Sequence, residues 1–438
     1  MSPREFLLDE LENVSNILNE SLRHDYTDQT HSFYNELNRR LRRVRQSLRE
    51  LDDTDYKQIE SKSKLVSELS TCISLIERSH LGEFSWEFAS NFRKLAEKIC
   101  IEPSLAAKYG KGSANRNPIF HISSQGGLSS YKIIRDTESL LENGRNRIFN
   151  IVFPRTLKPH VLLHIVIGHE LCHAALDIPG HSLANTKRLL QQNVFGDDGR
   201  AVAWMRKLKP TTPDFVEQRR NSYALELLCD LVAFILMGPS YVSALSSFLS
   251  AIDPEGCGTE ADKDTHPPYF ARLAVLQHVM RLRRLSRHGG KTKSSIEPES
   301  AHYYEQLNAM PVNMPSTLSP FSDDELGAAL DAITTALGAE VCFDHIDMNP
   351  LPVLLRNLRR GIPPSGCCIN AHDKKIELLG VDFRLILYAG WIYWSEVAST
   401  GRIKFLDVNR LCEKGLLHQI AVEKMLRSNR ANHGNSGP

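Results

Sequence analysis

The pentapeptide His169-Glu170-Leu171-Cys172-His173 constrains this chain more than any other stretch of its sequence. The residues before it are mostly apolar, and Pro159 at their start suits the first position of a helix, where no backbone N–H is needed. A helix through the pentapeptide puts His169 and His173 about one turn apart on the same face. Two imidazoles so placed can bind one Zn²⁺, with Glu170 beside the metal as a base. The stretch therefore predicts a zinc site that needs a third ligand. The alternative is a chance match on an ordinary helix.

Two carboxylates interrupt an otherwise apolar run over residues 223–234. Glu226 and Asp230 are four residues apart, so they share one face of a helix. Burying two unpaired carboxylates would be costly, which predicts a partner for each: a metal for Glu226 and a histidine N–H for Asp230. A carboxylate that accepts a hydrogen bond from a ligating imidazole fixes its tautomer and its orientation. The alternative is an amphipathic helix whose two acids face water.

A third segment contains His266, Pro267 and Arg272. With it, the order of motifs resembles the gluzincin metallopeptidases. It is most similar to the family of the CAAX prenyl proteases, the bacterial heat-shock membrane peptidase and the Oma-type mitochondrial peptidase. These proteins carry H-E-x-x-H, then E-x-x-x-D, then H-P with an arginine six residues after the histidine. The resemblance covers residues 145–285. The chain departs from it in lacking the family's membrane-spanning helices and in carrying Cys229 where alanine is usual.

The resemblance implies a gluzincin active site with Zn²⁺ as the cofactor. It also implies that the small sheet expected before the zinc helix lies along the cleft, where a strand edge binds the substrate backbone. The implied members of the site are the zinc ligands His169, His173 and Glu226, the general base Glu170, the outer carboxylate Asp230, and the oxyanion stabilisers His266 and Arg272.

Two further histidines near the motif are weaker candidates. The metzincin spacing needs glycine three and histidine six residues after the second motif histidine, but Leu176 and Pro179 stand there. We therefore expect His181 to be a loop histidine, and we keep it as the next candidate ligand if Glu226 fails. His164 lies ~140° around the helix from the first motif histidine, so we expect a packing or surface role.

The composition of the 438 residues is that of a soluble globular protein, with a net charge of +1. That charge gives no reason to expect nucleic acid or a membrane surface as a partner. No apolar run approaches the ~20 residues that span a bilayer, and the N-terminal residues do not resemble a signal peptide. The nine cysteines are scattered, which favours a reducing cytoplasm. We expect Cys172 and Cys229 to be small apolar fillers rather than ligands.

Apolar residues at helical spacing predict a helical N-terminal region. The three expected helices carry stripes at Leu7, Leu11, Val14, Leu18 and Leu22, at Leu37, Leu41, Val44, Leu48 and Leu51, and at Leu65, Leu69, Cys72 and Ile76. The second carries a basic run, Arg39–Arg45, which predicts either a solvated face or a contact with nucleic acid or an acidic partner. We favour the solvated face, because no aromatic residues are interleaved with the arginines.

Short strands are expected at 118–122, 131–134 and 147–153, the first two separated by a turn over 123–127. Ser322 and Glu325 form a capping box for a helix that stops at Gly338. The apolar run 383–394 predicts a buried core helix, because it is too short to cross a membrane.

The sequence thus predicts a mainly α (α+β) protein: a helical zincin-like metallopeptidase core with a small β-sheet, flanked by N- and C-terminal helical regions. The expected divisions are an N-terminal bundle or hairpins 1–105, a zinc metallopeptidase domain 106–290, a linker 291–300, a C-terminal helical domain 301–428 and a disordered tail 429–438.

The predicted function is zinc-dependent hydrolysis of a peptide bond in a protein or peptide substrate. One form of this prediction is a regulated protease in the cytoplasm that acts on a specific cellular protein. Its N- and C-terminal helical regions would then bind a regulatory protein. The alternative from another class is a non-catalytic regulatory or scaffold protein with a structural zinc site. Structural zinc usually has four protein ligands and no adjacent base, whereas the motifs supply three ligands and Glu170.

Overall fold

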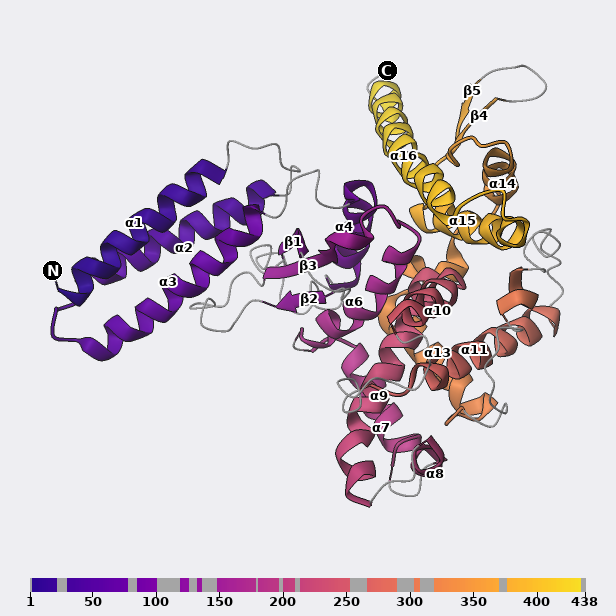
Figure 1. The fold of residues 1–438 in the computed structure, drawn as a ribbon, viewed down its shortest axis with the longest axis horizontal. Helices are drawn as coiled ribbons and strands as arrows, with labels where there is room; N and C mark the ends of the chain where they lie inside the picture. Colours follow the sequence, from indigo (N-terminus) through magenta and orange to yellow (C-terminus); the bar gives the residue numbers. More distant parts are fainter. Residues whose placement is uncertain are drawn as a thin grey trace. The chain divides into compact units, whose positions relative to one another are not determined.

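The computed structural model divides the chain into two compact units, residues 1–158 and 159–438, and each is described by itself (Figure 1). The structure describes residues 2–21, 30–77, 85–100, 119–125, 132–135, 148–178, 180–196, 200–208, 213–252, 266–289, 303–307, 319–369 and 376–434. The predicted linker 291–300 lies outside these residues. The expectation of a mainly helical protein with little sheet is confirmed.

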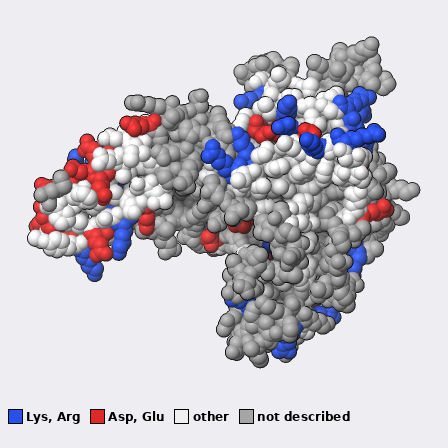
Figure 2. All heavy atoms as spheres, viewed as in Figure 1, with Lys and Arg blue, Asp and Glu red and all other residues white. Residues whose placement is uncertain are grey.

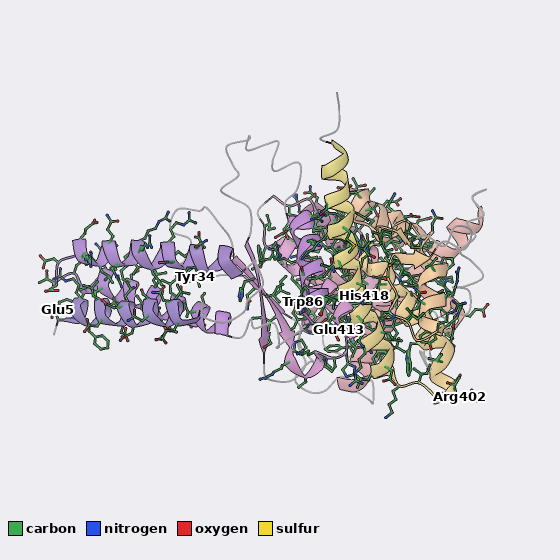
Figure 3. The ribbon with its side chains drawn as sticks, turned by 90° about the horizontal axis from the view of Figure 1, so that it is seen from above. Glu5, Tyr34, Trp86, Arg402, Glu413 and His418 are labelled. Atoms are coloured by element: carbon green, nitrogen blue, oxygen red, sulfur yellow. The ribbon has the colours of Figure 1, made fainter. Side chains whose placement is uncertain are left out.

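Three helices form a bundle at the start of the first unit: α1 (Pro3–Ser21), α2 (Thr30–Glu50) and α3 (Tyr56–Glu77). Their apolar stripes meet in one core, as predicted for the first two helices. On α3 the predicted Leu69 is fully buried, and the predicted Leu65 and Cys72 are partly buried against the same core; Ile59, Val66 and Ile73 are buried beside them. Tyr34, labelled in Figure 3, donates its hydroxyl to Asn19 Oδ1 at 2.9 Å and links α2 to α1.

The basic run of α2 pairs in part with an acid of its own helix. Glu36 accepts from Arg39 and, at 3.0 Å, from the buried Arg40. Figure 2 shows acidic and basic side chains interspersed over the described surface of this bundle. The prediction of a solvated face fits this arrangement, and a contact with a partner stays untested.

Helix α4 (Trp86–Cys100) and a three-stranded sheet complete the first unit, with the short 3₁₀ turn η3 (Arg155–Leu157) after them. Strand β3 (Ile148–Pro154) lies between β1 (Ile119–Gln125), to which it is parallel, and β2 (Lys132–Arg135), to which it is antiparallel. Strand β1 includes residues 123–125, so the predicted turn there begins too early.

The sheet has one aromatic face and one buried polar face. Phe153 meets Phe88 of α4 edge to face at 6.0 Å between ring centroids, which seats α4 on the aromatic face. On the other face Asn150 Oδ1 accepts from Ser123 at 3.1 Å and lies 3.0 Å from His121 Nδ1. These contacts offset part of the cost of burying polar side chains in a small sheet.

The second unit is built around the long helix α9 (Pro213–Met237). Residues 226–237 of α9 are all buried, and α6, α7, α8, α10, α11 and α13 pack against it. The remaining helices and strands are η4 (Leu163–Val166), α6 (Ile167–Leu176), α7 (Leu183–Asn193), α8 (Arg200–Leu208), α10 (Ser240–Ile252), α11 (Tyr269–Gly289), α13 (Asp323–Leu337), η6 (Ala339–Val341), η7 (Phe343–His345), α14 (Leu351–Arg359), β4 (Cys367–Ile369), β5 (Ile376–Leu378), α15 (Phe383–Val397), η8 (Ala398–Thr400) and α16 (Phe405–Gly434).

Several helix ends lie where the sequence predicts them. Ser322 and Glu325 make both hydrogen bonds of the capping box, and Gly338 ends α13 with φ 86°. Helix α15 is buried throughout residues 383–393, as predicted. Helix α16, however, continues to Gly434, through most of the segment predicted to be disordered. Residues 428–433 contain no proline or glycine, so nothing in them stops the helix earlier.

The division into units differs from the expected domain arrangement. The boundary at 158/159 falls inside the segment predicted as one domain, 106–290, so the sheet and the helices of the candidate site belong to different units. Helices α13–α16, predicted as a separate domain, belong to the same unit as α6 and α9. Among the described residues, no helix is long and apolar enough to cross a membrane.

Candidate metal centre

The candidate centre lies where α6 and α9 pack closely together. A Cβ atom at Gly168 would meet Met237 Cγ at 3.2 Å and Ala233 Cβ at 3.5 Å, so glycine allows the two backbones to approach. This packing sets the H-E-x-x-H segment of α6 against the E-x-x-x-D segment of α9. Two motifs about 60 residues apart in sequence thereby share one interface.

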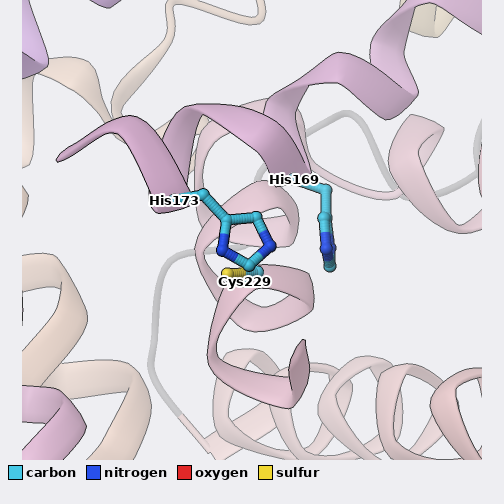
Figure 4. A group of neighbouring side chains, drawn as sticks. All are labelled: His169, His173 and Cys229. Atoms are coloured by element: carbon cyan, nitrogen blue, oxygen red, sulfur yellow. The ribbon is translucent and has the colours of Figure 1, made fainter. Parts of the chain in front are cut away.

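His169, His173 and Glu226 lie together in this interface. His169 Nε2 is 3.0 Å from Glu226 Oε2, and His173 Nε2 is 3.6 Å from Glu226 Oε1. The two imidazole rings leave the same face of α6, with their centroids 5.1 Å apart (Figure 4). The structure therefore brings together the three residues predicted as zinc ligands. Two nitrogen atoms and a carboxylate are a donor set that Zn²⁺ prefers.

His266 approaches the same carboxylate from another element, just before α11. Its Nε2 is 3.3 Å from Glu226 Oε2, and its side chain is 42% exposed. Three imidazoles thus surround Glu226, and His266 is the most exposed of them. This places His266 within reach of a molecule that enters from solvent.

Asp230 is fully buried behind His169 and accepts four hydrogen bonds or close contacts. Its Oδ1 lies 2.9 Å from His169 Nδ1, and it accepts from the Tyr241 hydroxyl of α10 at 2.6 Å. Arg272 of α11 donates to Oδ1 through Nη2 at 2.6 Å and to Oδ2 through Nε at 2.7 Å. Asp230 thus holds His169 Nδ1 and directs Nε2 toward Glu226, the arrangement that the sequence predicts for an outer carboxylate.

Arg272 is not placed where the resemblance implies. Arg272 is 7% exposed, and its guanidinium makes a bidentate pair with Asp230, with Nη2 3.3 Å from His169 Nδ1. Two of its donors are therefore committed on the buried side of His169. The geometry favours Arg272 as the counter-ion of Asp230 rather than as an oxyanion donor. Tyr241, which sequence reasoning missed, belongs to the same network.

The electrostatics of the site reflect two buried carboxylates that face one guanidinium. Burial opposes the charged form of His169, but the hydrogen bonds that its ring donates to Asp230 and Glu226 overcome this effect and raise the pKa of His169 to about 10. Burial and the neighbouring His169 lower the pKa of His173 to about 4. Despite their burial, the pKa values of Glu226 and Asp230 are lowered, by His169 and by Arg272 respectively. The site therefore favours a positive charge between Glu226 and Asp230, which a proton or a metal ion can supply.

Glu170 follows His169 directly on α6 and is half-buried. Since it is one residue from His169, its side chain leaves the helix about 100° away from the face that carries the two histidines. Glu170 is therefore not in the row of the two histidines, which suits a base better than a ligand.

Cys229, which we expected from the sequence to be a small apolar filler, lies in the cluster with the two histidines. Its Sγ and one nitrogen each of His169 and His173 all lie within 4.8 Å of one another (Figure 4). Cys172, the other cysteine of the motifs, is fully buried and is not in this group. The available signal was the helical angle: Cys229 is three residues after Glu226, which is only about 60° around α9.

The two weaker histidine candidates have structural roles. His181 is 1% exposed, and its Nδ1 accepts from the backbone N–H of Leu183 at 3.2 Å, at the start of α7. This hydrogen bond satisfies one of the amide groups that a helix start leaves without an internal partner. His164 is fully buried in η4, as expected for a packing residue.

The segment that leads into α6 is fixed by the last third of the chain. The predicted helix from Pro159 forms only from Ile167, and turns and η4 precede it. Leu162 N–H donates to Asn409 Oδ1 of α16 at 2.9 Å, and Trp391 of α15 donates to Leu162 O at 3.3 Å. These side chains take up backbone groups that an α-helix would use itself, so the tertiary contacts override the local preference.

Comparisons with protein families, with curated proteins and with solved structures found no match for this chain.

Proposed function

We propose that this protein is a zinc-dependent endopeptidase that hydrolyses a peptide bond, with Glu170 as the general base. The observation that carries the proposal is the convergence of His169, His173 and Glu226 from two helices. Glu170 follows His169 on α6, outside the row of the two histidines. These three residues would hold Zn²⁺. The ion, when bound, lowers the pKa of a water molecule to ~7 and polarises a carbonyl group.

The protein's own residues supply the remaining work. Asp230 accepts from His169 Nδ1, so that Nε2 keeps its lone pair toward the centre. Arg272 and Tyr241 keep Asp230 charged and in place. Glu170 accepts a proton from the attacking water and returns it to the leaving amine.

His266 is the proposed hydrogen-bond donor to the substrate. Its ring is partly exposed at the edge of the imidazole cluster, so its N–H can reach the oxygen on which negative charge develops. We assign the role of oxyanion donor to His266 alone, because the guanidinium of Arg272 is paired with Asp230.

The proposed substrate is a protein or peptide, and the proposed setting is a reducing cytoplasm. The seven described cysteines that are free in the structure fit that setting. We further propose that the helical flanks of the site bind a regulatory protein, so that cleavage is limited to a specific cellular substrate. The long bundle of the first unit offers a surface for such a partner.

The second candidate is a scaffold protein with a structural zinc. One observation favours it. His266 Nε2 lies 3.3 Å from Glu226, compared with 3.0 Å for His169 Nε2 and 3.6 Å for His173 Nε2, which makes a fourth protein donor available. Four protein ligands are typical of structural zinc. In this alternative Glu170 has no chemical task.

The test compares Glu170→Gln with His169→Ala, and Glu10→Gln on the exposed face of α1 is the matched control. We expect about one zinc per chain in the wild type and in both glutamine variants, and a loss of zinc in His169→Ala. A proteome-wide search for new protein N-termini should find wild-type products that disappear in Glu170→Gln and persist in Glu10→Gln. Retention of every wild-type cleavage product in Glu170→Gln would refute the endopeptidase.

His266→Ala separates the two candidates. The endopeptidase keeps its zinc in this variant, and its turnover falls ~10²–10³-fold, because one donor to the developing charge is lost. The structural site loses a ligand, so its zinc affinity falls and the protein unfolds at a lower denaturant concentration. Zinc loss from His266→Ala without any cleavage activity in the wild type would establish the scaffold.

A further inference from the structure

Cys229 lies in the candidate metal centre, but the proposed function gives it no role. It lies on α9 three residues after Glu226 and one before Asp230, with its sulfur near His169 and His173 of α6. Its side chain is fully buried. Figure 4 shows its sulfur beneath the ring of His173, with His169 beside them.

The separations suit a shared metal ion. The sulfur and one nitrogen of each histidine lie within 4.8 Å of one another. A tetrahedral zinc with ordinary bond lengths separates nitrogen and sulfur donors by about 3.6 Å. The three side chains therefore need to close by only about 1 Å, which rotation about their side-chain bonds can provide.

We propose that Cys229 is a further metal ligand, which joins His169, His173 and Glu226 to give a closed resting form of the centre. The inference rests on the proposed zinc site and extends it. The ligand is the thiolate: a bond forms between the metal ion and Sγ, the S–H bond breaks, and its proton leaves to solvent. No oxidant or reductant is required.

The chemistry of the cation follows from the donors. A thiolate added to two imidazoles favours borderline and soft divalent ions such as zinc, cobalt and cadmium over magnesium or calcium. A fourth protein donor also fills the position that a water molecule needs, so activation requires Cys229 to leave the ion.

The test is the absorption spectrum of the full-length protein loaded with Co²⁺, which replaces Zn²⁺ and reports its ligands. The visible bands show that cobalt is bound, and a charge-transfer band in the near ultraviolet shows a bond to a thiolate. We expect both in the wild type. Cys229→Ala should keep the visible bands and lose the charge-transfer band. Cys172→Ala, the matched control at the neighbouring buried thiol on α6, should keep both.

Any one of four outcomes overturns the inference. Visible bands without charge transfer in the wild type, or charge transfer that persists in Cys229→Ala, would show that Cys229 is not a ligand while the zinc site itself stands. Wild-type protein whose cobalt spectrum is unchanged by His169→Ala, or which binds no cobalt, would overturn the proposed centre together with this inference.

Discussion

The ion pair between Asp230 and Arg272 allows a quantitative test of how the centre is built. Asp230 is fully buried and Arg272 is 7% exposed, so neither charge can turn to water when the other is removed. The substitution Asp230→Asn weakens the metal site by removing the carboxylate that holds His169. It also leaves a buried guanidinium without its counter-ion.

The expected cost has two parts. Removing one partner of a buried ion pair costs about 3–5 kcal/mol of unfolding free energy, and the lower end applies here because asparagine can still accept one hydrogen bond. Loss of the outer carboxylate on His169 weakens metal binding about 10–100-fold, which corresponds to ~1.4–2.7 kcal/mol. The cost of breaking the ion pair is present without any metal ion, whereas the loss of metal affinity affects stability only when the metal ion is present.

The assay is a double-mutant cycle with Asp230→Asn, Arg272→Met and the double variant, measured by chemical unfolding in the presence of a chelator. Each single variant should lose about 3 kcal/mol, and the double variant should lose less than their sum by ~2–3 kcal/mol, because it leaves no unpaired charge. Zinc affinity, measured separately, should stay low in the double variant, since His169 still lacks its carboxylate partner. The control is Asp331→Asn on the exposed face of α13, which should change stability by less than about 0.5 kcal/mol.

Additive losses would refute this reasoning. If the double variant costs the sum of the single variants to within about 0.5 kcal/mol, the two side chains do not depend on each other. Recovery of wild-type zinc affinity in the double variant would equally contradict the role of Asp230 in orienting His169.

Three further variants test the surrounding structure. Burial lowers the pKa of His121 from 6.5 to about 4, so the unfolded chain takes up the proton at a higher pH than the folded protein does. The unfolding free energy should therefore fall by ~1.4 kcal/mol per pH unit as the pH drops from 6.5 toward 4. The unfolding free energy of His121→Gln should lack this contribution, and a pH dependence equal to that of the wild type would contradict the prediction. Asn409→Ala leaves the buried N–H of Leu162 without its acceptor and should cost about 1–3 kcal/mol in chemical unfolding, and a neutral result would argue against the hydrogen bond. Gly238→Ala puts a Cβ atom against the ring of Phe343 at a φ of +67° and should cost about 2–4 kcal/mol by thermal or chemical unfolding, so a neutral result would contradict the described turn.

Much of the secondary structure could be predicted because its causes are local. The capping box of Ser322 and Glu325 spans four residues, and the apolar run of α15 is buried because it has no polar face to expose. The failures have non-local causes. Helix α6 begins late because Asn409, 247 residues away, takes the N–H of Leu162.

The sequence by itself determined which candidate ligands share a face: spacings of four residues at His169 and His173, and at Glu226 and Asp230, give that result on any α-helix. Only the tertiary structure decided which side of His169 each partner occupies. Arg272 lies on the Asp230 side because of how α11 packs beside α9.

The same distinction applies to Tyr241 and Cys229, which join the centre through the packing of α10 and α6 against α9. Helical periodicity fixes directions within one element, over a few residues and a few ångströms. The distances between elements depend on the close approach of whole helices, such as the contact that Gly168 permits between α6 and α9, and no spacing within a single segment encodes that approach.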